Sequence, residues 1–387
     1  MEKFTYSIPT KIYFGKGQIS RLSELANYGS KVLLVYGGGS IKKLGIYDAA
    51  MEIMKENNLA VYELAGVEPN PRIESVRAGV EICKQNEIDM VLAIGGGSAI
   101  DCAKIVAAGA CTDADAWELV CNPRLMRKAL PIFTVLTLAA TGSEMDHFAV
   151  ISNPETNDKI GTAAQCIRPV MSVMDPTYTF SVSAKQTSAG TADIISHTLE
   201  NYFTNKTNAE VQARFAEGLL KVCFKNGPIA LAEPDNYDAR ANLMWASSMA
   251  INGLISNGAE VGWCVHPMEH ELSAFYDITH GEGLAILTPH WMDFVLNENT
   301  AWKFAEYGVN VWNLDANEDD MTIAKKAIQC TRDFFKQMNL PATLTEVGID
   351  EENFGIMAEK AAKGCRASFV PLTKEDVLCI YKASCNK

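Results

Sequence analysis

Histidine and acidic side chains gather in two stretches of this 387-residue chain. The first, GWCVHPMEHELSAFYDITHGEG, contains His266, His270 and His280, which are half of the six histidines in the chain. Upstream, GTADIISHTLE places Asp193 and His197 four residues apart, the spacing that puts two side chains on one face of a helix. We predict that these two stretches together hold one divalent metal ion.

The residue types narrow the choice of metal. Asp193 and His197 combined with His266 and His280 would offer three imidazoles and one carboxylate. Such a set suits Fe(II) or Zn(II), whereas Ca and Mg prefer shells made of oxygen. No pair of cysteines at metal-binding spacing points specifically to zinc, so the residue types leave iron and zinc both open.

Two glycine-rich turns follow short apolar runs that are typical of buried strands. Glycines let the backbone approach a ligand closely, and the helix that follows presents unpaired N–H groups and a positive dipole end to an anion. One such turn alone could be a plain connection between a strand and a helix. Two of them predict a dinucleotide at the strand ends of an open α/β sheet, although neither matches the G-x-G-x-x-G or P-loop pattern. The residues are Gly37, Gly38, Gly39 and Ser40 after KVLLVY, and Gly95, Gly96, Gly97 and Ser98 after IDMVLAI.

The first of these turns also bears on the choice between NAD and NADP. Proteins that select NAD commonly place an acidic side chain near the first strands, where it binds the ribose hydroxyls. Here the turn from Gly37 to Ser40 carries no charge, and Lys159 could add a positive charge. The sequence therefore favours NADP over NAD.

Apolar strand-like runs alternate with helical patterns through the first half of the chain, which predicts a doubly wound parallel sheet. The opening segment alternates apolar and polar residues as an edge strand does, and FAVIS with KIGTAA forms a predicted hairpin. Beyond DPTYTF only helical patterns remain. We therefore expect a nucleotide-binding α/β domain at 1–179 and a helical domain at 180–387. The predicted strands span 31–36, 59–64, 88–94, 131–138 and 170–176, and the later helices span 187–203, 209–223, 237–256, 321–338 and 353–363.

Composition excludes several classes of partner. Thirty-four basic against forty-seven acidic residues give a formal charge of -13, which would repel nucleic acid. No apolar run is long enough to span a membrane, and the first residues lack the apolar core of a secretory leader. The eleven cysteines include no C-x-x-C pair, so we expect reduced thiols in a cytoplasmic protein.

Several ordered motifs resemble one known family. GGGSAIDCAK, TLAATGSE, DPTYTF with GTADIISHTLE, and HPMEHELSAFYDITHGEGLAI resemble the iron-containing alcohol dehydrogenases, and EHELSAFYDITHG is most similar to their butanol dehydrogenase branch. The resemblance covers nearly the whole chain. It implies a Rossmann-like N-terminal domain, a helical metal-binding C-terminal domain in the architecture that dehydroquinate synthase shares, a catalytic metal in the cleft between them, and a homodimer.

The resemblance also implies roles for individual residues. The metal ligands would be Asp193, His197, His266 and His280, with Fe(II) as the metal and Zn(II) as the alternative. His270 would lie beside the nicotinamide, where it is a plausible proton relay. The expected cofactor contacts are Gly96, Gly97 and Ser98 at the pyrophosphate, Thr137 and Thr141 at the nicotinamide, and Asn70 and Lys159 as weaker contacts. Asp101 would either cap the glycine turn or contact the cofactor.

The implied reaction is reversible hydride transfer between a primary aliphatic alcohol, or its aldehyde, and the nicotinamide. Three alternatives remain open: a glycerol dehydrogenase, a metal-dependent lyase like dehydroquinate synthase, and a nucleotide-binding regulatory module without catalysis. The lyase would need basic residues near the metal, and HPMEHELSAFYDITHG offers none. Candidates for an apolar substrate pocket are Phe148, Trp245, Trp263, Phe275 and Tyr276.

Overall fold

The computed structural model of the chain describes residues 1–205 and 208–385, which form two compact units. This division differs from the predicted domain boundary between residues 179 and 180. The reason is that a helical segment from the second half of the chain, Asp235–Ser248, groups with the sheet. The α/β unit comprises Ser7–Val182 and Asp235–Ser248, and the helical unit comprises Met1–Tyr6, Ser183–Pro234 and Met249–Lys387.

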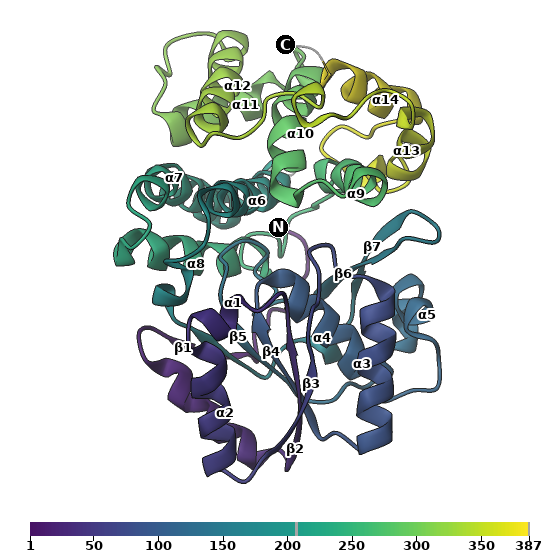
Figure 1. Cartoon of the computed structure of the whole chain (residues 1–387). Coiled ribbons are helices and arrows are strands. Elements are labelled where there is room, and N and C mark those ends of the chain that lie inside the picture. The colour runs from purple at the N-terminus through teal and green to yellow at the C-terminus, as the bar shows by residue number, and fades with distance from the viewer. Residues whose placement is uncertain (206–207, 386–387) are drawn as a thin grey trace. The chain divides into compact units, whose positions relative to one another are not determined.

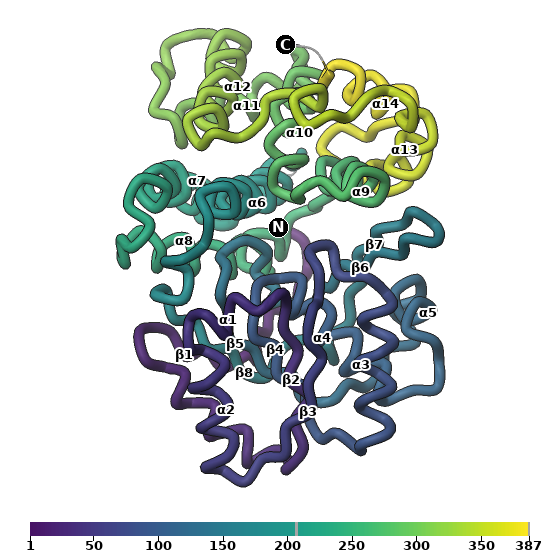
Figure 2. The backbone as a smooth tube through the Cα atoms, viewed as in Figure 1, coloured from purple at the N-terminus to yellow at the C-terminus, as the bar shows by residue number. Residues whose placement is uncertain are grey.

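The α/β unit is built on a six-stranded sheet in the order β1-β8-β5-β4-β2-β3 (Figure 1). Every strand pair in it is parallel, which confirms the predicted doubly wound sheet. Figure 2 follows the same backbone as a tube and labels β8 beside β5. The strands are β1 (Lys11–Phe14), β2 (Lys31–Tyr36), β3 (Ala60–Leu64), β4 (Met90–Gly95), β5 (Ile132–Leu136) and β8 (Met171–Met174). The predicted hairpin is also present, as β6 (Phe148–Asn153) paired antiparallel with β7 (Asp158–Ala163).

Helices cover both faces of this sheet because its strands are apolar on both sides. Successive strand residues point to opposite faces, so Val32 and Leu34 enter one core while Leu33 and Val35 enter the other. The first core is closed by η1 (Gln18–Asn27), α1 (Ser40–Lys43) and α2 (Ile46–Glu56). The second is closed by α3 (Ile73–Asn86), α4 (Gly97–Gly109) and α5 (Ala116–Cys121).

Helix α8 (Tyr237–Ile251) explains the difference from the sequence-based division. Its Met244 is fully buried in the second core of the sheet, and its Trp245 packs edge-on against Phe14 with ring centroids 5.8 Å apart. Helical periodicity predicts the helix itself. It carries no information about which unit the apolar face will cover, since that depends on contacts distant in sequence.

The helical unit is organised around α6 (Ala184–Tyr202), in which every residue from 187 to 202 is buried. Helices α7 and α10 pack against it. The predicted helices are present, and the histidine-rich stretch adds two that the periodicity did not mark, α9 and α10. The remaining helices of the unit are α7 (Glu210–Ala232), α9 (Val265–Tyr276), α10 (His280–Val295), α11 (Ala301–Trp312), α12 (Asp320–Gln337), α13 (Phe354–Ala361) and α14 (Lys374–Ala383).

Short 3-10 turns complete the two units: η2 (Pro123–Leu125), η3 (Gln165–Ile167), η4 (Pro176–Thr179), η5 (Thr345–Val347) and η6 (Cys365–Ala367). Within the described ranges, no helix combines the length and the apolar character needed to cross a membrane.

Candidate functional site

Helix α6 carries the first two predicted metal ligands into the interior of the helical unit. The helix begins after Ser183, whose hydroxyl accepts the N–H of Gln186 at 3.3 Å. Asp193 and His197 lie one turn apart on its buried length, as their spacing predicts. Oδ1 of Asp193 is 3.5 Å from Nε2 of His197.

Two further helices bring the other two predicted ligands to the same carboxylate oxygen. His266 lies in the first turn of α9 and His280 is the first residue of α10. Nε2 of each ring is 3.6 Å from Oδ1 of Asp193. Three imidazole nitrogens therefore surround one carboxylate oxygen at distances too long for good hydrogen bonds. The structure thus brings all four predicted residues together.

Two atoms of this group lack the partners that buried polar atoms need. Among the described residues, Oδ1 of Asp193 and Nε2 of His266 are buried and have no hydrogen-bond partner. Leaving such an atom unsatisfied costs about 1–3 kcal/mol. A cation held by both atoms would remove that cost, so the donor set fits a metal of the iron or zinc type.

The electrostatics of the group also favour a positive charge. Burial alone would raise the pKa of the Asp193 carboxyl, but the charge that His197 and the other imidazoles can carry holds this pKa well below its usual range. Burial disfavours the charged imidazole of His266, yet Glu200 and Asp193 raise its pKa to about 9. The surroundings therefore stabilise positive charge, whether it is carried by protons or by a metal cation.

Two buried glutamates contact the rings of His266 and His280, and neither was identified from the sequence. Nδ1 of His266 contacts Oε2 of Glu200, and Nδ1 of His280 contacts Oε2 of Glu269. Each glutamate lies three residues after a predicted ligand, Glu200 after His197 and Glu269 after His266. An acidic residue one helical turn from a candidate ligand, on a helix with few exposed positions, is the signal that could have revealed them.

His270 lies one helical turn after His266 on α9, next to the ligand group. Its ring centroid is 6.2 Å from that of His266 and 5.7 Å from that of His280. Glu269, His270 and His280 also lie close enough together to bind a cation. The nitrogen of His280 that faces Asp193 is Nε2, whereas Nδ1 faces Glu269, so the two groups use opposite sides of one ring.

Of the five aromatic residues proposed for a substrate pocket, Trp263 is the one that packs against predicted ligands. Its ring centroid is 4.6 Å from that of His266 and 5.3 Å from that of His197, and its indole N–H donates to Asn201 at 3.2 Å.

The other four aromatic residues contact different neighbours. In the helical unit, the Phe275 ring lies 5.3 Å from the Lys360 ammonium, and the Tyr276 hydroxyl accepts from Asn353 at 3.1 Å. In the α/β unit, Phe148 packs on the ring of His147 at 4.3 Å, and Trp245 packs on Phe14 as described above.

In the α/β unit, both glycine turns lie at the same edge of the sheet. They follow β2 and β4, and Thr137 follows β5; these three strands are neighbours and run parallel. Gly39 has φ 98°, a conformation that favours glycine, and Gly96 is the residue before the first turn of α4. The N–H of Thr137 donates to the carbonyl of Gly95 at 3.0 Å. The predicted cofactor residues of the two turns therefore face one region of space at the carboxyl ends of the strands.

The carboxylate of Asp101 accepts hydrogen bonds from two groups of the protein itself. Its Oδ1 accepts the hydroxyl of Ser143 at 2.5 Å and its Oδ2 accepts the N–H of Val150 at 2.9 Å. One turn later, the fully buried ammonium of Lys104 donates to the Ser143 hydroxyl and to Asp146. This buried network ties α4 to the loop that carries TLAATGSE, which favours the structural role of Asp101 over a direct contact.

Asn70 and Lys159, far apart in sequence, belong to segments that meet through Ser152. The N–H of Ser152 donates to the carbonyl of Pro71 at 2.9 Å, and Ser152 pairs with Lys159 across the β6–β7 hairpin. Asn70 has φ 51° in the loop just before Pro71. The loop after β3 and the hairpin therefore form one local surface of the α/β unit.

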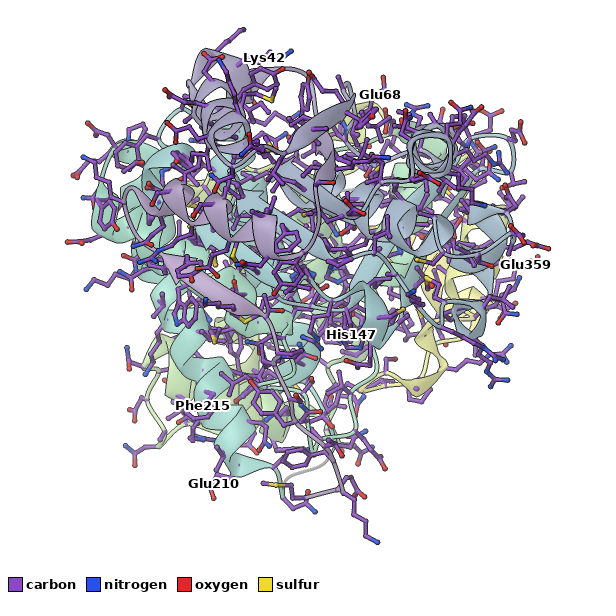
Figure 3. All side chains as sticks on the ribbon, turned by 90° about the horizontal axis from the view of Figure 1, so that it is seen from below. Lys42, Glu68, His147, Glu210, Phe215 and Glu359 are labelled. Carbon is purple, nitrogen blue, oxygen red and sulfur yellow. The ribbon has the colours of Figure 1, made fainter. Side chains whose placement is uncertain are left out.

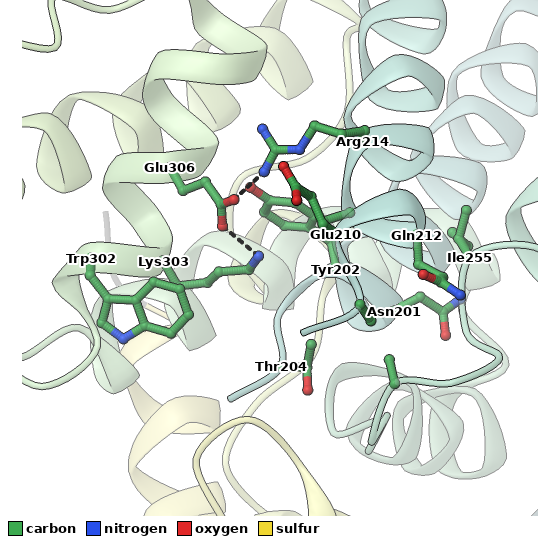
Figure 4. Close-up of a pocket in the computed structure, with 13 residues that line it drawn as sticks. Asn201, Tyr202, Thr204, Glu210, Gln212, Arg214, Ile255, Trp302, Lys303 and Glu306 are labelled. Carbon is green, nitrogen blue, oxygen red and sulfur yellow. Dashed lines mark hydrogen bonds and ion pairs between the residues drawn. The ribbon is translucent and has the colours of Figure 1, made fainter. Parts of the chain in front are cut away.

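The helical unit also contains a separate cavity of about 240 Å³ (Figure 4). It is lined by polar and charged side chains from α6, α7 and α11, including Asn201, Gln212, Arg214, Lys303 and Glu306. None of the predicted metal or cofactor residues lines it. Charged side chains of the cavity pair with one another, because Glu306 accepts from both Lys303 and Arg214. The cavity is therefore not the predicted substrate site.

Comparisons with known proteins cover almost the entire chain. The family model "Iron-containing alcohol dehydrogenase" matches residues 9–176, and "Fe-containing alcohol dehydrogenase family, C-terminal" matches residues 187–385. NADH-dependent butanol dehydrogenase A of Clostridium acetobutylicum is 57% identical over 99% of this chain and 100% of its own length. NADPH-dependent aldehyde reductase YqhD of Escherichia coli is 39% identical over 93% of each chain. The crystal structure of NADH-dependent butanol dehydrogenase A from Thermotoga maritima superposes with a TM-score of 0.95 at 37% identity, covering 100% of this chain and 99% of that one.

Proposed function

The chain belongs to the iron-containing alcohol dehydrogenase family, and we propose that it interconverts primary aliphatic alcohols and aldehydes by hydride transfer with NAD(P). The observation that carries the proposal is the convergence of three imidazole nitrogens on Oδ1 of Asp193. The butanol dehydrogenase and aldehyde reductase relatives support the same class of substrate.

We assign the metal to Asp193, His197, His266 and His280. When bound, the metal would polarise the substrate oxygen as a Lewis acid and the nicotinamide would exchange the hydride. The family name supports Fe(II), and the donor types suit Zn(II) as the alternative. A bound cation would satisfy the two buried atoms that lack hydrogen-bond partners, one on Asp193 and one on His266, and this favours its retention.

We assign proton transfer to His270. Its ring lies next to two of the proposed ligand rings without being one of the three that face Asp193. An imidazole can gain or lose a proton near neutral pH, as the exchange of a proton with the substrate hydroxyl requires. Trp263, held by Asn201 against the rings of His197 and His266, is our candidate for limiting the size of the substrate.

We place the dinucleotide on the two glycine turns and on Thr137, Thr141, Asn70 and Lys159, and we keep the preference for NADP. No acidic side chain lies in the turn from Gly37 to Ser40. Lys42, two residues further on α1, is exposed, with its ammonium 5.1 Å from the Tyr36 ring centroid (its position is labelled in Figure 3). The carboxylate of Glu63 at the end of β3 is engaged by the hydroxyls of Tyr36 and Tyr47. Named relatives use either NADH or NADPH.

We also propose the homodimer and the cytoplasmic location inferred from the sequence.

The catalytic proposal is tested by following oxidation of NADPH with butanal in protein purified without air, before and after treatment with a chelator. We expect aldehyde-dependent oxidation that the chelator abolishes and Fe(II) restores. Metal-replete protein with no aldehyde-dependent signal would contradict the proposal.

A further inference from the structure

We propose that Glu200 and Glu269 are positioning residues that fix two of the proposed metal-binding imidazoles by accepting a hydrogen bond from Nδ1–H of each ring. The inference rests on the proposed metal site. It adds two residues that lie outside the set of four ligands and that the motif resemblance did not indicate.

Glu200 joins α6 to the start of α9. Its Oε1 accepts the N–H groups of Cys264 and Val265 at 2.5 and 2.7 Å, and its Oε2 accepts the N–H of His266 at 3.1 Å together with its ring Nδ1. Helix α9 has no cap from its own preceding side chain, so Glu200 satisfies the unpaired N–H groups of its first turn. One carboxylate therefore sets both the start of the helix and the orientation of the ring that the helix carries.

Glu269 makes the corresponding link from α9 to α10. It is fully buried, its Oε2 contacts Nδ1 of His280, and its Oε1 accepts the hydroxyl of Ser273. Both oxygens are thus engaged by side chains that have no role in capping a helix. Helix α9 consequently carries one proposed ligand, His266, and the carboxylate that holds another, His280.

The packing around Glu269 and at the start of α10 is close. A Cβ added at Gly283 would lie 2.8 Å from Cγ of Glu269, and a Cβ added at Gly281 would lie 2.0 Å from the carbonyl oxygen of Ala189 on α6. The two glycines of HGEG therefore allow α10 to approach α6 and Glu269 closely. This close approach brings His280 to both Asp193 and Glu269.

The contacts determine which ring nitrogen is available to a metal. An ionised carboxylate only accepts hydrogen bonds, so Nδ1 of His266 and of His280 must carry the proton. In the neutral ring, which is the form that binds a metal, the lone pair is then on Nε2, the atom of each ring that lies 3.6 Å from Oδ1 of Asp193. Such partners also make the imidazole a stronger donor to a metal, and their loss typically weakens metal affinity by about 10–100-fold.

The decisive variant is Glu269→Gln, because Glu269 does not cap a helix and the amide keeps the shape of the side chain. Glu200→Gln is its companion, since the amide oxygen can still accept backbone N–H groups. Glu271→Gln is the matched control: Glu271 is a buried glutamate on the same helix, but it pairs with Lys360 at 3.4 Å instead of with an imidazole.

The experiment is calorimetric titration of metal-free protein with Fe(II) without air and with Zn(II), alongside thermal unfolding of each metal-free protein. We expect affinity about 10–100-fold weaker in Glu269→Gln and Glu200→Gln, unchanged affinity in Glu271→Gln, and an unchanged Tm of metal-free Glu269→Gln. Wild-type affinity in Glu269→Gln would overturn the inference, as would a weaker affinity accompanied by an equally large loss of metal-free stability, since both carboxylates would then be structural only. If the wild-type protein itself binds neither metal, the proposed function fails instead, and the two failures are distinguishable.

Discussion

Gly97 and Thr141 are in contact at the edge of the sheet where the carboxyl ends of the strands lie: a Cβ added at Gly97 would lie 2.5 Å from both Oγ1 and Cγ2 of Thr141. Gly97 begins α4, and Thr141 lies in the loop after β5, where its hydroxyl accepts the N–H of Ser143 at 3.2 Å. The missing side chain at Gly97 is therefore what allows two predicted cofactor residues to lie together.

The first prediction follows from this contact. Gly97→Ala should push Thr141 away from the turn and lower kcat/KM for the nucleotide by roughly tenfold or more, equivalent to about 1.4 kcal/mol. The effect should appear mainly in KM and in nucleotide binding measured by fluorescence. Gly218→Ala is the control, since Gly218 lies on an exposed helical position with open space around it and the change should leave both quantities unaffected. Equal nucleotide affinity in Gly97→Ala would remove the turn from the cofactor site.

The second prediction concerns the choice of nucleotide. Lys42→Gln should lower kcat/KM for NADPH more than for NADH, because the ammonium near the first glycine turn can pair with the additional phosphate of NADP. Lys43→Gln removes a neighbouring exposed charge from the same short helix and should change the ratio little. A ratio that is unchanged in Lys42→Gln, or wild-type protein that uses NADH and NADPH equally well, would argue against the preference for NADP.

The third prediction tests the ligand at the centre of the metal group. Asp193→Ala should abolish retention of iron and zinc, because Oδ1 of Asp193 is the atom on which three imidazole nitrogens converge. Elemental analysis of protein purified without air is the measurement. Glu217→Gln is the control, since Glu217 is a buried carboxylate of the same unit that accepts from the Tyr202 hydroxyl and faces no predicted ligand. Full metal occupancy in Asp193→Ala would disprove the assignment.

Local patterns in the sequence were sufficient to predict the sheet and to pair Asp193 with His197, whereas the family resemblance was needed to separate His266 and His280 from His270. Buried parallel strands produce continuous apolar runs, and a spacing of four places two side chains on one helical face, so Asp193 and His197 could be paired from the sequence. Glu200 was missed because its role depends on where α9 begins relative to α6. The grouping of α8 with the sheet was missed for a related reason: Trp245 packs against Phe14, and Met244 is buried in a core formed by residues of the first half of the chain.

The fourth prediction concerns Glu144, a fully buried carboxyl in the loop that carries TLAATGSE. Its Oε1 accepts the hydroxyl of Ser248, whereas its Oε2 has no hydrogen-bond partner among the described residues. Burial raises the pKa of Glu144 from 4.5 to about 7, although the hydrogen bond from Ser248 lowers it. Of the nearby charges, Asp146 raises this pKa and Lys104 lowers it, both by less. The folded protein should therefore keep this proton at pH values where the unfolded chain has lost it.

The sign of the pH effect follows from proton binding in the two states. Between about pH 4.5 and 7 the folded state binds more protons at Glu144 than the unfolded state, so this residue makes folding less favourable as pH rises, by up to roughly 3 kcal/mol. Glu144→Gln cannot titrate and keeps an acceptor for Ser248. The Tm of Glu144→Gln minus that of wild type, measured by calorimetry on metal-free protein, should therefore increase from about pH 5 to about pH 8 and then level off. Ser248→Ala removes a hydrogen bond that lowers the pKa of Glu144 and leaves the carboxyl, so its stability should decline with rising pH at least as much as that of the wild-type protein. A Tm difference between Glu144→Gln and wild type that does not change with pH would show that the pKa of Glu144 is the same in the folded and the unfolded protein, which would contradict the prediction.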